Sequence, residues 1–194
     1  SCLVGSEMCI RDRPGDWGLA PTENGLRVTR PLSPGRIPVD GSRTSQLISG
    51  LLMALPGLAA DSELVLTGPL ASRPYVELTL AVLERCGIVI EESPGGFFVP
   101  GGQRFRPVPI EPEPDWSAAA FWLAIAALGC PVEVMGLRRD SLQGDRAAGA
   151  LCRCLPGTVD LTDIPDLLPP LALAAALQPG KCTRFTGAAR LRDK

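Results

Sequence analysis

The 194-residue chain contains no histidine and no Cys-x-x-Cys spacing. Without histidine it offers no imidazole base, no Ser-His-Asp triad and no His-ligated metal. Cys152 and Cys154 form only a Cys-x-Cys pair, so the ligand spacing of a zinc site is missing and such a site is not favoured. The other cysteines at apolar positions are expected to be reduced thiols in the core of a cytosolic protein. They are Cys86, Cys130 and Cys182.

The chain also lacks a basic cluster and a stretch long enough to span a membrane. A net charge of −2, without any run of Lys or Arg, argues against a nucleic acid or an anionic membrane as partner. The longest uncharged run, 116–132, contains Ser117 and Gly129 and is interpreted as a buried helix rather than a membrane span. This helix, 116–128, is apolar nearly all round and is expected to be covered by protein on both faces. No signal peptide is recognised, and a cytoplasmic location is expected. Residues 1–13 resemble translated adapter sequence and are excluded from the fold.

What the chain does contain is a repeated strand–helix pattern. A content of 45% hydrophobic and 21% charged residues is typical of a folded globular chain. Three predicted strands end alike, ELVLTG (63–68), PVEVMG (131–136) and CTRFTG (182–187). Each follows an Ala/Leu-rich segment of helical period, and a second helix follows the first two. This recurrence indicates a repeated α/β module.

Local patterns fill in parts of the modules. Val76, Leu80 and Leu83 recur at helical spacing and predict the buried stripe of a helix. A hairpin is predicted across residues 93–96. The proline-rich segment 104–115 is predicted to be an extended connector between domains.

Two predicted helices begin with clusters of hydroxyl groups. The stretch DGSRTSQLISGLL (40–52) carries Gly41, three hydroxyls and an amide at the start of an apolar helix. A second helix begins similarly at ASRPY (71–75). Capping is the simpler explanation of either start alone. Because free N–H groups at a helix start attract anions, two such starts in one module favour a phosphate between them.

Three aspartates precede helical segments. Asp163 and Asp166 flank Ile-Pro before the last apolar helix, and each is typical of an N-cap. Asp166 is followed by four apolar residues, so its carboxylate is expected to press against them, which would raise its pKa and suit a general base. Asp145, in the tripeptide QGD, is interpreted as structural.

Together these motifs resemble the 5-enolpyruvylshikimate-3-phosphate synthase family. The matching stretches, in family order, are DGSRTSQLISGLLMALP, GPLASRPYVELTL, DWSAAAFWLAIAAL, GLRRDSLQGD, DIPDLLPPLALAAAL and AARLRDK. The resemblance implies an α/β fold of two domains built from βαβαββ repeats, the inside-out α/β barrel of the enolpyruvyl transferases, with both domains partial. Residues 14–112 would belong to the domain that binds shikimate 3-phosphate, and residues 113–194 to the second domain.

The resemblance also implies a reaction. The enolpyruvyl group of phosphoenolpyruvate would be transferred to the 5-hydroxyl of shikimate 3-phosphate, a step towards aromatic amino acids, without cofactor or metal. Asp166 would take the proton of the attacking hydroxyl, and Lys194 would bind substrate and assist proton transfer. The implied substrate-binding residues are Thr44, Ser45, Gln46, Ser72, Tyr75, Asp166 and Lys194. The family's basic residues for phosphoenolpyruvate have no counterpart here, so the chain alone is expected to be inactive, and the full-length enzyme to be a monomer.

Three departures from the family pattern accompany this match. Thr44 stands where the family usually has Ser, and Asp193 where an apolar residue is common. Residues 146–162 are shorter than in many members, with CRCLPGTVDLT in place of a strand pair. Two alternatives stay open, the related UDP-N-acetylglucosamine enolpyruvyl transferase and a non-catalytic module that binds the ligand. SRTSQ and SRPY favour the shikimate branch, and no cysteine here lies in a loop like that of the UDP-sugar enzyme.

Overall fold

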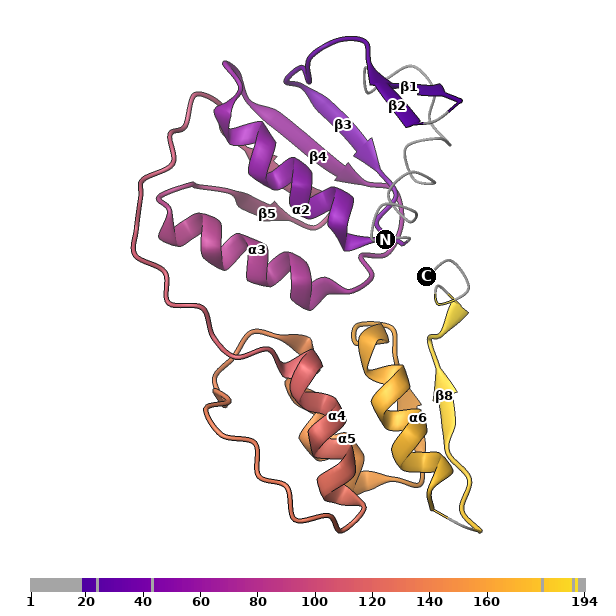
Figure 1. Cartoon of the computed structure of the whole chain (residues 1–194). Coiled ribbons are helices and arrows are strands. Elements are labelled where there is room, and N and C mark those ends of the chain that lie inside the picture. Colours follow the sequence, from indigo (N-terminus) through magenta and orange to yellow (C-terminus); the bar gives the residue numbers. More distant parts are fainter. Residues whose placement is uncertain (1–18, 24, 43, 179, 190, 192–194) are drawn as a thin grey trace. The chain divides into compact units, whose positions relative to one another are not determined.

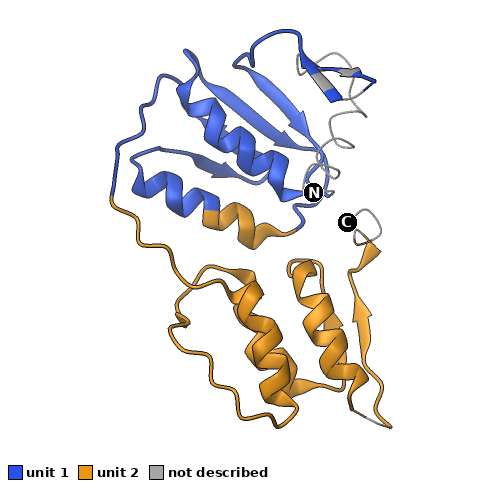
Figure 2. Ribbon diagram, in the orientation of Figure 1, with its two compact units in different colours: residues 1–71, 79–108, 193–194 blue, residues 72–78, 109–192 orange. Residues whose placement is uncertain are grey.

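The computed structural model of the chain describes residues 19–191 except 24, 43, 179 and 190. The proposed leader 1–13, Asp193 and Lys194 lie outside the described residues. The chain divides into two compact units, which Figure 2 shows in separate colours. The first unit contains residues up to 71 together with 79–108, and the second contains 72–78 and 109–192. The boundary between residues 108 and 109 falls inside the segment 104–115 that was predicted to connect two domains. The assignment of residues 14–112 and 113–194 to the two domains of the family stays a prediction.

The elements of the first unit follow one another as βαβαββ. They are β3 (Arg36–Val39), α2 (Ser45–Ala54), β4 (Ser62–Leu66), α3 (Arg73–Arg85), β5 (Glu91–Ser93) and β6 (Gly96–Val99). A short 3₁₀ turn, η1 (Leu55–Gly57), ends α2, and the strands β1 (Leu19–Thr22) and β2 (Gly25–Val28) form a separate antiparallel pair. The first residues of α3, 73–78, count with the second unit. One complete copy of the predicted βαβαββ module is therefore present.

The four strands of this module form one sheet in the order β3-β4-β6-β5. β3 and β4 are parallel, as a strand–helix–strand crossover requires, and the hairpin β5-β6 adds two antiparallel strands. Figure 1 shows α2 and α3 on the same side of the sheet. The predicted strand at 63–68 and the predicted hairpin across 93–96 are confirmed, since Glu63–Leu66 lie in β4 and Ser93 pairs with Gly96.

Apolar spacing explains how the two helices pack. In α2 the buried apolar residues Ile48, Leu51 and Leu52 lie on one stripe. In α3, Val76 and Leu83 are buried while Glu77 is exposed, which confirms the predicted stripe. In the sheet of the first unit, Val39, Leu64, Phe97 and Val99 are buried as well, each at most 2% exposed.

The second unit is a group of helices beside a two-stranded parallel ladder. Its elements are α4 (Trp116–Ala127), η2 (Gly144–Ala147), α5 (Ala148–Cys154), β7 (Thr158–Asp160), η3 (Pro165–Leu167), α6 (Leu168–Ala176) and β8 (Arg184–Thr186). β7 pairs with β8 in parallel, with η3 and α6 as the crossover. This is a second strand–helix–strand unit, and within the described residues no hairpin like β5-β6 is paired with it.

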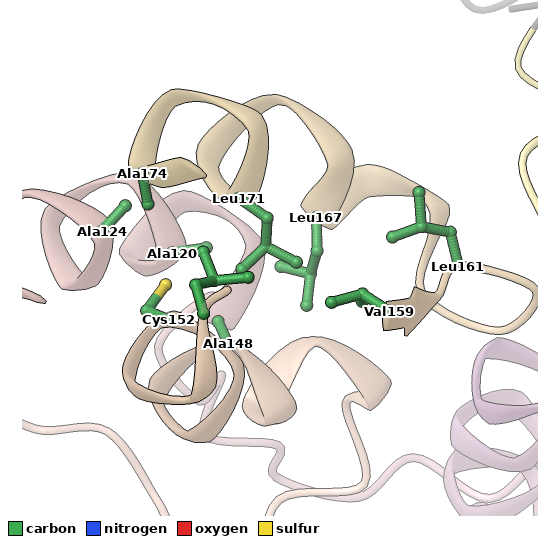
Figure 3. Packing of buried hydrophobic residues seen from close by; sticks show 10 residues of the cluster. Ala120, Ala124, Ala148, Cys152, Val159, Leu161, Leu167, Leu171 and Ala174 are labelled. Carbon is green, nitrogen blue, oxygen red and sulfur yellow. The ribbon is translucent and has the colours of Figure 1, made fainter. Parts of the chain in front are cut away.

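Alanines and leucines make up most of the core of the second unit. Its buried members are Ala120, Ala124, Ala148, Cys152, Leu155, Val159, Leu161, Leu167, Leu171 and Ala174. Figure 3 shows these side chains gathered between the helices and next to β7. Because alanine side chains are short, the helices can approach closely, and the leucines of η3 and α6 fill the remaining space.

The two parallel strand pairs end with the same turn. After β3, Oδ1 of Asp40 accepts hydrogen bonds from N and Oγ of Ser42, at 2.9 and 2.7 Å. After β7, Oδ1 of Asp160 accepts from N and Oγ1 of Thr162 at the same two distances. A Cβ on Gly187, which follows β8, would collide with Asp160 and Thr162. The glycine that ends the stretches 63–68 and 182–187 therefore leaves room for an aspartate turn after the neighbouring strand.

Two strand predictions in the second unit fail. Residues 131–136 are not a strand, because β7 and β8 pair with each other and no other described strand lies in this unit to receive them. Met135 in this segment is 82% exposed. Conversely, β7 lies within residues 152–162, where the sequence analysis predicted no strand. With three residues and one inward side chain, Val159, it is too short for a periodic signal.

Two burial predictions also need correction. Cys130 and Cys182 are exposed, because both lie in irregular segments outside the helices, and among the described cysteines the buried one is Cys152 of α5. α4 was expected to be covered on both faces, yet Phe121 and Trp122 are 45% and 56% exposed. Within its unit, α4 buries only the face that carries its small residues, including Ala120 and Ala124.

Candidate active site

The start of α3 has an unusual backbone. Ser72, directly before the helix, has a φ of 54° and is buried. Such a conformation is uncommon outside Gly, Asn and Asp, and backbone strain of this kind concentrates at functional sites. The carbonyl of Ser72 accepts a hydrogen bond from the backbone N of Tyr75 at 3.1 Å. The turn thus holds a serine and the single tyrosine of the chain at one end of the helix.

The hydroxyl of Tyr75 meets two carboxylates from distant parts of the second unit. It lies 3.1 Å from Oδ2 of Asp145 in η2 and 3.2 Å from Oδ2 of Asp166 in η3. Asp145 is only 1% exposed, whereas Asp166 is exposed. The hydroxyl of Ser117, in α4, donates a short hydrogen bond to the same oxygen of Asp145. These residues form one hydrogen-bonded cluster whose solvent-facing carboxylate is Asp166.

Burial and negative charge disfavour ionisation inside this cluster. Burial raises the pKa of Tyr75 well above its usual range, and the charges of Asp145 and Asp166 raise it further. Burial also raises the pKa of Asp145, although the hydrogen bonds from Ser117 and Tyr75 act in the opposite direction. The phenol is therefore protonated at neutral pH and available as a hydrogen-bond donor.

Replacing Asp145 by Asn should stabilise the chain more at pH 8 than at pH 4. A carboxyl whose pKa rises on folding contributes its full stability below its unfolded pKa of about 3.9, and this contribution is lost as the pH rises through the folded pKa. The neutral amide does not titrate and escapes this loss. Urea unfolding of both chains across this pH range measures the difference. A difference that does not change with pH would contradict the raised pKa of Asp145.

Asp163 caps a helix other than the one predicted. Its Oδ1 accepts a hydrogen bond from the backbone N of Arg73, the first residue of α3, at 3.3 Å. The N-cap positions before η3 and α6 are occupied by Ile164 and Leu167, neither of which makes a side-chain cap. Asp163 is therefore a cap, as expected, but for a helix start 90 residues away in sequence.

The environment of Asp166 also differs from the prediction. The sequence placed its carboxylate against apolar neighbours, but the adjacent Pro165 and Leu167 turn into the core while Asp166 is exposed. Its Oδ2 contacts a polar group, the hydroxyl of Tyr75. The argument for a base in an apolar pocket is thus wrong, and what is observed instead is an accessible carboxylate held by a phenol.

The start of α2 lies in the first unit and carries several hydroxyl groups. Thr44 is the N-cap, and its Oγ1 accepts a hydrogen bond from the backbone N of Gln46 at 3.1 Å. Ser45, the first helical residue, is 6% exposed, while Gln46 is exposed. The hydroxyl of Ser42 is bonded to Asp40. The role of Thr44 is therefore explained by helix capping, and that of Ser42 by the turn it forms with Asp40. Neither the cap nor the turn explains why Ser45 and Gln46 follow them.

Gly41 lets two loops pack backbone to backbone. Its carbonyl accepts a hydrogen bond from the backbone N of Ala71 at 3.0 Å. A Cβ on Gly41 would lie 3.2 Å from the carbonyl oxygen of Pro69 and 3.3 Å from Cα of Leu70. The loop that leads to α2 is therefore fixed to the residue directly before Ser72. A phosphate between the two helix starts stays a prediction.

Sequence reasoning missed the buried half of the cluster. Asp145 was interpreted as structural only, and Ser117 as one position of an apolar helix. The available signal was the pair of tripeptides DWS and QGD, each with a polar residue at the start of an otherwise apolar helical segment. Lys194 lies outside the described residues. Among the residues described, no cluster of metal-ligating side chains occurs and no helix has the length and apolarity to cross a bilayer.

Comparisons with a family model and with curated proteins point to the same family. Residues 22–153 match the family described as EPSP synthase (3-phosphoshikimate 1-carboxyvinyltransferase). A 3-phosphoshikimate 1-carboxyvinyltransferase of Idiomarina loihiensis is 41% identical over 187 residues, which cover 83% of this chain and 43% of the relative. The protein of that name from Clostridium kluyveri is 35% identical over 196 residues, which cover 89% of this chain and 46% of the relative. The chain thus spans less than half the length of these curated relatives.

A solved structure supports the fold. The crystal structure of the enolpyruvyl transferase NikO from Streptomyces tendae superposes with a TM-score of 0.55 at 18% identity. The match covers 88% of this chain and 49% of the other. At this identity the likeness bears on architecture alone, and it agrees with the strand–helix modules described above.

Proposed function

Because the chain belongs to the EPSP synthase family, we propose that it is part of an enzyme that transfers the enolpyruvyl group of phosphoenolpyruvate to the 5-hydroxyl of shikimate 3-phosphate. The products would be 5-enolpyruvylshikimate 3-phosphate and phosphate, on the route to aromatic amino acids. Within the chain, the contact of 3.2 Å between the Tyr75 hydroxyl and the exposed Asp166 carboxylate carries the proposal, because it provides an accessible, oriented base.

In the proposed reaction, the 5-hydroxyl oxygen of shikimate 3-phosphate attacks C2 of phosphoenolpyruvate, and Asp166 takes the proton of this hydroxyl. Protonation of C3 completes a tetrahedral intermediate. Loss of phosphate and of a proton from C3 then restores the double bond. Asp166 suits the first step because it is exposed and because the Tyr75 hydroxyl fixes Oδ2 of its carboxylate. Lys194, which lies outside the described residues, is proposed to bind substrate and assist proton transfer.

Recognition of shikimate 3-phosphate is proposed for the hydroxyl-bearing helix starts. Thr44, Ser45 and Gln46 stand at the first turn of α2, where backbone N–H groups favour an anion. Ser72 and Tyr75 stand at the start of α3. Burial of Ser45 and Ser72 is compatible with this role, since a buried hydroxyl loses little entropy when it binds a ligand.

The comparisons favour the shikimate substrate over a UDP-sugar. The relatives named above are 3-phosphoshikimate 1-carboxyvinyltransferases. A monomeric full-length enzyme in the cytoplasm, with phosphoenolpyruvate as second substrate, belongs to the same proposal. To test it, the chain is fused with the flanking parts of the Idiomarina loihiensis relative, and this fusion is called the completed enzyme below. It should restore growth without aromatic amino acids to a bacterium that lacks its own synthase; a folded fusion that fails to do so would contradict the proposal.

Replacing Ser45 or Ser72 by Ala in the completed enzyme should weaken the binding of shikimate 3-phosphate. Each lost hydrogen bond to the charged phosphate should cost about 1.5–3 kcal/mol, or roughly a 10- to 150-fold rise in Kd. Ser49→Ala is the matched control, because Ser49 lies one turn further along α2 and its Oγ accepts from Thr79 at 2.9 Å. Calorimetric titration gives the affinities. Wild-type binding in both variants would reduce Ser45 and Ser72 to structural residues.

A further inference from the structure

Asp145 is a buried carboxyl that the proposed chemistry does not use. It is 1% exposed, and within the described part of the chain its Oδ1 has no hydrogen-bond partner. Burying a carboxyl costs free energy, and leaving one oxygen unpaired adds to that cost. The reason for a carboxyl at this position is therefore sought in the contacts of its other oxygen, Oδ2.

That other oxygen joins three separate elements. Oδ2 of Asp145, in η2, is contacted by the hydroxyl of Tyr75 from α3 and by the hydroxyl of Ser117 from α4. The same Tyr75 hydroxyl lies against Oδ2 of Asp166 from η3. A continuous path of hydrogen bonds therefore runs from the buried carboxyl through the phenol to the exposed carboxylate.

Counting hydrogens shows what the buried carboxyl contributes. A phenol has one O–H, so it donates to only one of the two carboxylates that it contacts. The other contact is favourable only if a carboxyl proton points at the phenol oxygen. Of the two carboxyls, Asp145 is the buried one, whereas Asp166 is exposed, and burial disfavours the anion of Asp145 and raises its pKa. With that proton on Asp145, the oxygen of Tyr75 accepts from Asp145, and the Tyr75 hydroxyl is left to donate to Asp166.

We propose that Asp145 is a positioning residue, which holds the hydroxyl of Tyr75 so that the Tyr75 proton is directed at the carboxylate of Asp166. This rests on the proposed function, in which Asp166 is the base. Asp145 is 1% exposed, and it is linked to the exposed carboxylate of Asp166 through the Tyr75 hydroxyl. Its role is to fix which way the phenol donates, and through the phenol the orientation of the base.

The single tyrosine makes the first step testable in the 194-residue chain itself. With ¹³C-labelled tyrosine, Tyr75 gives one NMR signal for its Cζ and one for its hydroxyl proton. In Asp145→Asn the amide retains a donor and an acceptor, so the hydroxyl proton should stay protected from exchange. In Asp145→Leu, of similar size and without polar atoms, the Cζ shift should move and the protection should be lost. Unchanged Tyr75 signals in a folded Asp145→Leu chain would overturn the proposal.

Kinetics of the completed enzyme test the second step. Asp145→Leu should lower kcat by about 10- to 100-fold, the scale expected for a misplaced catalytic group, while KM for shikimate 3-phosphate changes little. Asp145→Asn should restore most of kcat. Tyr75→Phe, which removes one oxygen and keeps the ring, should lower kcat by the same factor as Asp145→Leu. The double variant should be no slower than either single one, because both break one path.

The outcomes separate this inference from the proposed function. If Asp145→Leu does not fold, Tyr75→Phe decides, and wild-type kcat in that variant overturns the inference. Additive losses in the double variant also overturn it, since they would mean that Asp145 acts independently of the phenol. If the completed enzyme has no turnover at all while the Tyr75 signals respond as expected, the proposed function fails and the hydrogen-bond path stands.

Discussion

Asp166→Asn should lower kcat of the completed enzyme by about 10²–10⁴-fold, the usual contribution of a positioned base. The amide has nearly the shape of the carboxylate and still accepts from Tyr75, but it cannot take the proton of the 5-hydroxyl. Affinity for shikimate 3-phosphate should therefore stay within a few-fold. The chain has no histidine that could replace the lost base. Steady-state kinetics and calorimetric titration of the same preparation measure the two effects separately.

Asp163→Asn is the matched control, three residues earlier in the chain. Asp163 caps the first N–H of α3. Its replacement should destabilise the protein by about 0.5–2 kcal/mol at most, since Asn also caps helices, and should leave kcat nearly unchanged. If Asp163→Asn abolished turnover while Asp166→Asn only lowered stability, the roles of the two residues would be reversed, and Asp163 would be the base.

Gly96→Ala should cost the first unit roughly 3 kcal/mol or more of its free energy of unfolding. Gly96 begins β6 with a φ of 149°, which disfavours any residue with a side chain. A Cβ there would also collide with the carbonyl oxygen of Leu64 and lie 3.0 Å from its carbon. That carbonyl belongs to the neighbouring strand β4, so it cannot move without breaking the sheet.

Gly95→Ala provides the comparison. A Cβ on Gly95, in the turn before β6, would meet nothing within 4 Å. Its substitution should change stability by no more than about 0.5 kcal/mol. Urea unfolding followed by far-ultraviolet circular dichroism measures both variants. Equal stabilities would mean that the pairing of β6 with β4 is not as described.

The features that the sequence predicted correctly are those with a local signal. The stripe of Val76 and Leu83 depends on helical period alone, and the hairpin from Ser93 to Gly96 depends on neighbouring residues. The family motifs fixed the βαβαββ order in the same way. Each of these can be recognised within a window of about one to two dozen residues.

The features that could not be predicted depend on distant contacts. Tyr75 meets Asp145 across 70 residues of sequence and Asp166 across 91. No local pattern distinguishes an aspartate that caps its own helix from one that reaches another element, so Asp163 was assigned to the wrong helix start. For α4, the composition indicates that burial would be favourable, but it does not say which segment would cover Phe121 and Trp122.

The most direct test of the account is ³¹P NMR of the completed enzyme mixed with phosphoenolpyruvate and shikimate 3-phosphate. We expect the phosphoenolpyruvate signal to be replaced by inorganic phosphate, with one shikimate 3-phosphate consumed for each phosphate released. Asp166→Asn should slow this exchange by the factor given above. A folded completed enzyme that binds shikimate 3-phosphate and leaves both substrate signals unchanged would contradict the assignment of this site to enolpyruvyl transfer.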